Sequence, residues 1–307
     1  MQPRRWLGAD GATNLALLVL LGAVWGVSFM VITMGFASFS PLLLAAIRFD
    51  LAGALLLAVA AAWRPGALVP RGRRAWMAVA FASLLNVAAY HGFLFWGQQY
   101  TLEAVAAVIV GLNPLLTTAF SRWLLEDERV GPSGFVGLAL GFAGIGVLAL
   151  LKPGATFDAV GLGQLAVLAA VASWALGSVL VRRQRVDLHP IVLTAWQCLL
   201  GAVVLHAASL ATEGGGRAVF DANGLFALFY LAVVSTAFGL ALYFTLHRRV
   251  GPIRVNLVSH IVPVFATLSG FLVLGTPIEA RTILAFVLIV AGFALVLRPV
   301  HRRQDHK

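Results

Sequence analysis

Charge is scarce in this sequence: 11% of its 307 residues are charged, whereas 61% are hydrophobic. A typical soluble protein has about 25% charged residues, so a water-soluble fold would have too little polar surface to cover this chain. Apolar runs of roughly 20 residues recur, and each is long enough as a helix to cross a hydrocarbon core about 30 Å thick. The composition therefore predicts an all-α integral membrane protein.

Other absences narrow the function. The single cysteine, Cys198, lies inside an apolar run and excludes an internal disulfide framework. The sequence has no glycine-rich phosphate loop followed by lysine, no metal-ligand spacing, and no nucleophile with a recognisable base. We therefore expect no cofactor, no metal and no enzymatic activity.

The net charge of +10 would indicate a nucleic-acid partner if the basic side chains formed one patch. They lie instead in short gaps between apolar runs, so we expect a lipid bilayer and no nucleic acid around the chain. No obligate protein partner is evident, which favours a monomer. The basic start, Met1–Arg5, resembles a signal peptide, but a long apolar run and many more follow it, so we interpret the first run as an uncleaved helix.

Ten transmembrane spans account for the apolar runs, with proline and glycine concentrated in the connections between them. The predicted spans are 14–34, 41–63, 75–97, 101–124, 132–151, 161–181, 190–211, 224–246, 252–274 and 280–298.

Lysine and arginine fix the orientation, because they concentrate in cytoplasmic loops. With ten spans, 18 of the 22 basic residues fall on one side and three on the other, and Arg48 lies within a span. One missed or invented helix would invert every later loop and destroy this bias. The sequence therefore places both termini in the cytoplasm, and we expect a bacterial inner membrane.

The chain also contains an internal duplication, found by sliding the sequence along itself. We divide it into repeats at 1–153 and 154–307, each with five spans. The matches at a spacing of 149 residues are Trp25 with Trp174, Pro41 with Pro190, and Pro114 with Pro263. Because five is odd, the second repeat enters the membrane from the opposite face, so the two repeats are inverted. Inverted repeats place a binding site near mid-membrane and expose it alternately to each side, which predicts a transporter of small molecules.

Short motifs add a resemblance to a known family. They are AVWG at 23–26, AAIRF at 45–49, LNP at 112–114, EDER at 126–129, GFAG at 141–144, SWA at 173–175 and IVP at 261–263. Together they resemble the EamA-type ten-helix members of the drug/metabolite transporter superfamily, over about residues 14–298. Such families usually place Gly-Glu after the ninth span, where this chain has Gly275-Thr276. The resemblance implies export of amino acids or related metabolites by alternating access.

Arg48 is the sharpest single feature, because an arginine at mid-bilayer costs about 2.5–3.5 kcal/mol on insertion scales. It either attracts a substrate carboxylate or serves the outer gate, or else it caps carbonyls of a neighbouring helix or snorkels outward. Asp50 is two residues away and does not share its helix face, so a direct ion pair is not implied.

Polar and aromatic side chains within other spans are the remaining candidates for a substrate chamber lined by spans one, three, four, six, eight and nine. Polar groups are costly in lipid, so these faces are expected to look inward, either toward substrate or toward hydrogen bonds between helices. Pro114 and Pro263 are expected to bend their helices. The candidate substrate-binding residues are Trp25, Asn86, Tyr90, His91, Trp174, Ser178, Asn256 and His260.

Two rival substrates from the same superfamily need other side chains. A sugar-phosphate or nucleotide-sugar carrier would need several basic residues in the chamber, where only Arg48 is available. A multidrug carrier would need a buried acid to face cationic substrates, and only Asp50 qualifies. His91 and His260 could carry protons, since an imidazole titrates near neutrality.

The predicted topology can be tested with tags at the two ends of the chain. Both tags should react with an impermeant reagent from the same, cytoplasmic side of the membrane. Ends that label from opposite sides would remove the basis for two inverted repeats.

Overall fold

The computed structural model describes residues 9–63, 68–124, 132–150, 159–186, 188–250, 255 and 258–296. Within these ranges the chain forms helices and turns, with one isolated antiparallel bridge between Phe39 and Ala218. The helices of the first half are α1 (Ala9–Gly35), α2 (Pro41–Trp63), α3 (Arg73–Phe81), η3 (Ala82–Ala89), α4 (Tyr90–Gln98), α5 (Glu103–Val110), α6 (Asn113–Leu124) and α7 (Pro132–Leu150). Those of the second half are α8 (Ala159–Arg183), α9 (Pro190–Glu213), α10 (Ala222–Phe229), η4 (Tyr230–Phe238), α11 (Gly239–Val250), α13 (Val258–Ser269), η5 (Gly270–Leu274) and α14 (Ala280–Val296).

These helices form ten rods that correspond to the ten predicted spans. The π-helical stretch η3 joins α3 to α4 in the third rod, and η4 joins α10 to α11 in the eighth. Seven rods of the described chain are long and apolar enough to cross a membrane, and the others include the shorter apolar stretches Phe135–Gly144, Val258–Leu274 and Ala280–Gly292. The all-α membrane architecture expected from the sequence is confirmed.

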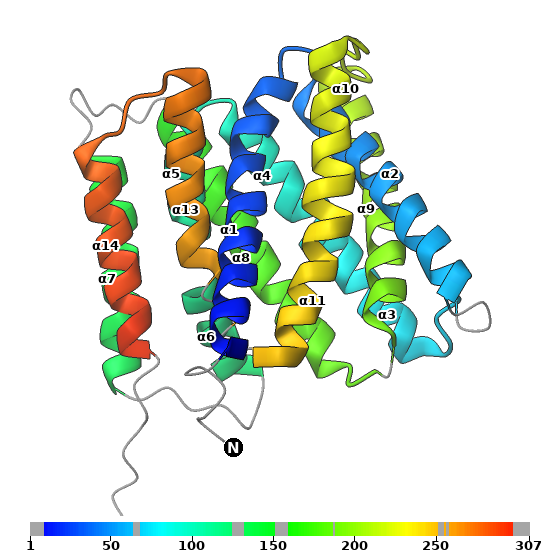
Figure 1. Ribbon diagram of the computed structural model, residues 1–307, viewed down its shortest axis with the longest axis horizontal. Coiled ribbons are helices and arrows are strands. Elements are labelled where there is room, and N and C mark those ends of the chain that lie inside the picture. The colour runs from blue at the N-terminus through cyan, green and yellow to red at the C-terminus, as the bar shows by residue number, and fades with distance from the viewer. Residues whose placement is uncertain are drawn as a thin grey trace, which may run out of the picture.

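The rods pack as two inverted halves. Helix α2 packs on its counterpart α9, and α7 packs on its counterpart α14 (Figure 1). Helix α1 packs on α13, and the equivalent contact in the other half joins α8 to α6. The first rod begins and the tenth rod ends at the same end of the bundle (Figure 1). This exchange of partners is what a two-fold relation between five-helix repeats requires.

Two of the three π-helical stretches of the described chain, η3 and η4, also follow the repeat, because η3 begins at Ala82 and η4 begins 148 residues later at Tyr230. A π-helical turn widens the helix and releases backbone groups for other partners, and such turns are frequent at functional sites. Both stretches lie in the third span of their half.

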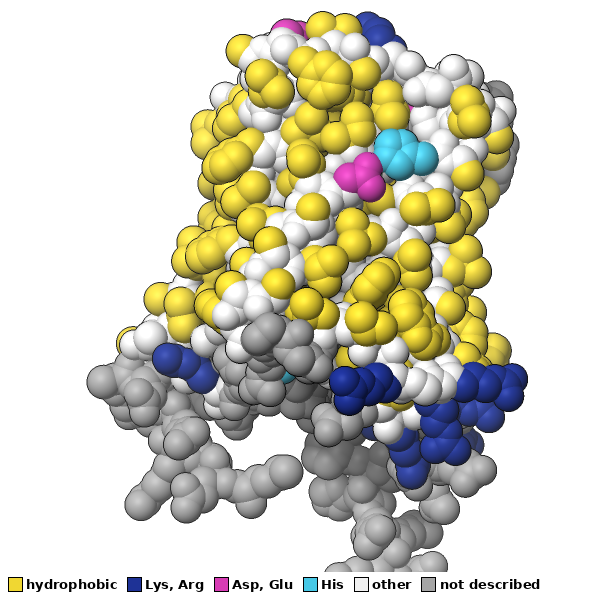
Figure 2. Space-filling model, turned by 90° about the vertical axis from the view of Figure 1, so that its right-hand side faces the viewer, with side chains coloured by type: hydrophobic (Ala, Val, Ile, Leu, Met, Phe, Trp, Pro, Cys, Tyr) yellow, Lys and Arg dark blue, Asp and Glu magenta, His cyan; other side chains and the backbone are white. Residues whose placement is uncertain are grey.

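Basic side chains of the described chain gather at the end where α1 begins. Figure 2 shows dark blue side chains at the lower end of a mostly apolar face, with few at the upper end. Those at the lower end include Arg73 and Arg74 at the start of α3 and Arg182 and Arg183 at the end of α8. The uneven distribution of basic residues, on which the predicted topology rests, is therefore visible on the folded surface.

The end away from these arginines is closed by bonds between the repeats. Arg217, between α9 and α10, donates to the carbonyls of Phe36 (2.9 Å) and Ala37 (2.6 Å), between α1 and α2. Glu213 accepts from the backbone N–H groups of Leu42 (2.9 Å) and Leu43 (3.2 Å), and so caps the start of α2. We call this set of contacts the outer latch, because the predicted topology places this end outside the cell.

Asp221 completes the outer latch. Its Oδ1 accepts hydrogen bonds from the Gly224 N–H and the Ser38 hydroxyl, both at 2.7 Å. These two bonds, that of Gly224 first, lower the pKa of the Asp221 carboxyl, so it stays an ionised acceptor at lower pH than an ordinary aspartate.

Close packing of the fifth and tenth rods gives a test of the fold. A Cβ at Gly292 on α14 would lie 2.4 Å from the Gly137 carbonyl oxygen on α7, whereas a Cβ at Gly161 would meet nothing within 4 Å. Gly292→Ala should destabilise the protein by about 1–3 kcal/mol through overpacking, and Gly161→Ala should be neutral or slightly stabilising. Thermal unfolding in detergent measures both, and equal melting temperatures for the two variants would contradict this packing.

Candidate functional site: a central cavity between the repeats

A cavity of about 490 Å³ lies between the two halves of the bundle. This volume is in the range of small-molecule sites. Its lining runs from mid-span residues such as Arg48 to Val181 near the end of α8 and Leu193 near the start of α9. Both of these helix ends lie at the arginine-rich end, so the cavity extends toward that end and stops below the outer latch.

Arg48 is buried in the wall of this cavity, with 7% of its surface exposed. Its Nε and Nη2 donate to the Thr236 hydroxyl at 3.2 and 3.0 Å, and Nη2 also lies 3.4 Å from the Ser235 hydroxyl. The guanidinium lies 4.9 Å from the ring centre of Phe49. Among its described contacts there is no carboxylate and no carbonyl oxygen, so Arg48 neither snorkels outward nor caps a helix.

The π-helical stretch η4 supplies the hydroxyl groups that surround Arg48. The Thr236 hydroxyl accepts from Arg48 and donates to the Leu231 carbonyl five residues earlier, at 2.8 Å. The Ser235 carbonyl accepts from the Trp25 indole at 3.1 Å. The wider turn therefore presents both a hydroxyl pair and a backbone carbonyl to the other repeat.

Each repeat contributes a tryptophan that packs on a tyrosine of the opposite repeat. Trp25 on α1 stacks on Tyr243 of α11 with ring centres 5.8 Å apart. Trp174 on α8 lies against Tyr90 of α4 at 4.9 Å. All four rings line the cavity and form two aromatic walls. The two tryptophans are equivalent in the repeat, whereas the two tyrosines are not.

Hydrogen bonds follow the same relation. Asn86 donates to the Ser178 hydroxyl at 3.3 Å, joining the third and sixth rods. The hydroxyls of Ser28 and Ser235 are bonded at 2.7 Å, joining the first and eighth rods. Ser235 lies 149 residues after Asn86 and Ser178 lies 150 residues after Ser28, so the two bonds occupy corresponding places in the two halves to within one residue.

His91 is buried beside this polar group. Its Nδ1 lies 3.2 Å from the Val87 carbonyl oxygen, and its ring packs edge-on against Phe49 (4.4 Å between centres) and Tyr90 (4.6 Å). The cavity lining therefore contains an imidazole next to the arginine and the aromatic walls.

The structure brings most of the predicted side chains together. Those that line the cavity are Trp25, Arg48, Asn86, Tyr90, His91, Pro114, Trp174 and Ser178. His260 is not among the lining residues, although its neighbour Ser259 is, and Asn256 lies outside the described residues.

The two prolines differ from each other. Pro114 follows a break at which α5 ends and α6 begins, so the span is interrupted there. Helix α13, in contrast, continues through Pro263, and its α-helical geometry changes only at Gly270.

The second and seventh spans also line the cavity, although from these spans the sequence led us to expect only Arg48. They contribute Arg48 and Phe49 from α2, and Thr194, Gln197 and Cys198 from α9. Sequence reasoning also missed Ser235, Thr236 and Tyr243. The internal repeat could have predicted Ser235 and Gln197, since Ser235 is the equivalent of Asn86 and Gln197 is the equivalent of Arg48.

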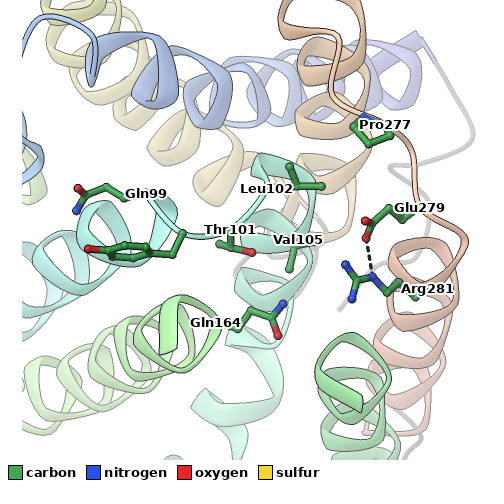
Figure 3. A pocket seen from close by; sticks show the side chains of 9 residues that line it. Gln99, Thr101, Leu102, Val105, Gln164, Pro277, Glu279 and Arg281 are labelled. Carbon is green, nitrogen blue, oxygen red and sulfur yellow. Dashed lines mark hydrogen bonds and ion pairs between the residues drawn. The ribbon is translucent and has the colours of Figure 1, made fainter. Parts of the chain in front are cut away.

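A second cavity, of about 390 Å³, lies at the latch end between the α4–α5 connection, α8 and the start of α14 (Figure 3). Its two charged groups, Glu279 and Arg281, bond to each other at 2.6 Å. Figure 3 shows this pair at one side of a polar recess with Gln164 and Thr101. The recess is not between the aromatic walls, so the central cavity is the better candidate site.

Comparison with known proteins decides the family. The profile of the EamA-like transporter family matches twice, at residues 13–150 and again at 161–298. The chain belongs to the EamA-like transporter family. It is therefore a multi-pass membrane transporter rather than an enzyme. The two matches fall on the two halves of the bundle, while the repeat boundary that we placed after residue 153 stays a prediction.

Individual relatives agree with this assignment. The chain is 32% identical to the uncharacterized inner membrane transporter YedA of Escherichia coli K12, with 92% of this chain and 90% of YedA covered. It is 29% identical to the uncharacterized transporter YvbV of Bacillus subtilis, with 91% and 90% covered. A crystal structure with 24% identity superposes with a TM-score of 0.65 over 93% of this chain and 96% of that one, which supports the fold.

Reporter cysteines can test whether the central cavity holds water. In a Cys198→Ala background, Thr117→Cys in the cavity wall should react with a charged maleimide at least ten times faster than Val203→Cys, which is 63% exposed on the surface that faces lipid. Thiolates do not form readily in hydrocarbon, so the outer site should stay unlabelled in membranes. Equal labelling of the two positions would argue against a hydrated cavity.

Proposed function

We propose that this protein is a secondary transporter that exports amino acids, aromatic or other neutral ones in particular, and related small metabolites. Transport would proceed by alternating access to the central cavity. The observation that carries the substrate class is Arg48, a buried cation at mid-span whose described partners are hydroxyl groups and aromatic rings. A buried charge needs a counter-charge, and a substrate carboxylate would supply it.

The surroundings of Arg48 fit the rest of an amino acid. The aromatic walls made by Trp25 with Tyr243 and by Trp174 with Tyr90 would contact an apolar or aromatic side chain. Asn86, Ser178 and His91 offer polar groups within the same cavity for the amino group.

The direction of transport follows from the orientation proposed for the chain. The arginine-rich end and both termini would lie in the cytoplasm of a bacterial cell, with the protein in the inner membrane. Since the cavity extends toward that end and the outer latch closes the other, the protein would be in the state that receives substrate from the cytoplasm. Opening toward the outside would require the bonds of Arg217 and Glu213 to break.

The composition of the cavity argues against the two rival substrates. Arg48 is the one arginine or lysine among the described lining residues, whereas a sugar phosphate or nucleotide sugar would need several. The same lining has no aspartate or glutamate, which a cationic drug would need. Asp50, the acid considered from the sequence, pairs with His206 outside the cavity.

The proposal is tested by uptake of labelled amino acids into proteoliposomes. Arg48→Gln keeps hydrogen-bonding capacity but removes the charge, and should reduce transport about 10- to 100-fold, because a charge-assisted hydrogen bond is worth about 1.5–3 kcal/mol. Alanine at Tyr90, His91 or Trp174 should also lower transport. Arg249→Gln, at an exposed arginine near the end of α11, is the matched control and should leave transport unchanged.

Two results would contradict the proposed substrate. One is movement of a sugar phosphate or a cationic dye when no amino acid moves. The other is unchanged amino-acid transport by the Arg48→Gln protein.

A further inference from the structure

An acid and a histidine lie together on the outer surface of the bundle, away from the central cavity. The Asp50 carboxylate on α2 and the His206 imidazole on α9 are 2.6 Å apart, and their side chains are 45% and 42% exposed. Figure 2 shows the face of α2 and α9, where one acidic and one histidine side chain stand side by side in a mostly apolar surface. Neither residue lines the cavity.

The position of this pair along the helices places it in hydrocarbon. Asp50 is the tenth residue of α2 and His206 lies seven residues before the end of α9. At 1.5 Å per residue, these positions are about 14 and 11 Å from the helix ends. Leu51, Val203 and Leu210 around the pair are 47%, 63% and 69% exposed, as expected for lipid-facing side chains.

The hydrogen bond between Asp50 and His206 uses only one polar atom of each side chain. The contact uses Asp50 Oδ2 and His206 Nε2. Within the described chain, Asp50 Oδ1 and His206 Nδ1 have no hydrogen-bond partner. Lipid tails offer none either, and an unsatisfied polar group in hydrocarbon costs several kcal/mol. With the imidazole protonated, an acceptor and a donor therefore lie next to each other on this exposed surface.

A second copy of the same chain is the partner that this arrangement fits. A two-fold axis along the membrane normal would set the donor of one copy against the acceptor of the other, which is how a two-fold interface is self-complementary. His206 as imidazolium would donate through Nε2 to its own Asp50 and through Nδ1 to the Asp50 of the other copy. The result is a closed ring of alternating charges shielded from lipid.

The helix surface around the pair allows such an approach. Ala54 and Ala58 on α2 and Ala207 and Ala211 on α9 are exposed at four-residue spacing. Small residues at this spacing let membrane helices come close together, and polar side chains then hold them.

We propose that α2 and α9 form the interface of a homodimer, held by reciprocal hydrogen bonds between Asp50 and His206 of the two copies. The sequence alone favoured a monomer, since it does not show that these two residues meet. The dimer is independent of the proposed substrate, because neither residue touches the cavity.

Cysteine cross-linking in membranes tests the interface. In a Cys198→Ala background, Ala207→Cys on α9 should form a disulfide dimer on mild oxidation. Val287→Cys on α14, which is 55% exposed on another lipid-facing helix, is the control and should stay monomeric. Equal cross-linking at both positions, or none at Ala207→Cys, would overturn the proposal.

A charge exchange separates the hydrogen bonds from general packing. Asp50→His or His206→Asp alone places like groups together and should weaken the dimer about tenfold, because interhelical hydrogen bonds are lost. The double variant Asp50→His with His206→Asp restores a complementary pair and should recover the dimer. Subunit counting in dilute liposomes gives the dimer fraction, and monodisperse elution in detergent shows that each variant is folded. Single variants that dimerise like the wild type would rule out this pair as the contact.

Discussion

Hydrocarbon offers no hydrogen bonds, so every polar group of a membrane-spanning chain must find its partner within protein or water. This constraint explains why the described chain is helical and why most polar side chains within its spans turn inward. Asn86 reaches Ser178, Ser28 reaches Ser235, and Arg48 reaches Thr236. All three bonds join helices of different repeats. The same hydrogen bonds therefore satisfy the polar groups and hold the two halves together.

The two repeats are related by symmetry, but the side chains at the site do not all follow it. The tryptophan walls and the bonds of Asn86 and Ser235 occur in both halves. Arg48 does not, because its equivalent is Gln197, which is neutral. The cavity therefore combines two aromatic walls with a single positive charge, and that charge makes the two halves of the site different. A substrate with one acidic and one apolar end would lie in it in one orientation.

The π-helical stretches link fold and site. In a regular α-helix, each backbone carbonyl accepts from the N–H four residues later, and a threonine hydroxyl donates to the carbonyl four residues earlier. In η4 the Thr236 hydroxyl bonds to Leu231, five residues back, and the Ser235 carbonyl is available to Trp25. The Trp25 bond holds the first rod of one repeat against the third rod of the other, and Thr236 also accepts from Arg48 of the second rod. A change of helix geometry in this rod would therefore alter the cavity and the contact between the repeats together.

The sequence alone determined the all-α membrane fold, the ten spans and their inversion, because hydropathy, charge bias and a duplication are one-dimensional signals. It also found eight residues of the cavity lining. Arg48 stood out because a charge within a span is costly in lipid, Trp25 and Trp174 because they are equivalent in the repeat, and Tyr90 because it shares a helix face with Asn86. Only the tertiary structure decided which groups meet. No sequence pattern predicts the π-helical turns, so the pairing of Arg48 with Thr236 could not be predicted from the sequence. Asp50 and His206 are 156 residues apart in sequence, and only the packing of α2 on α9 shows that they meet on the lipid-facing surface.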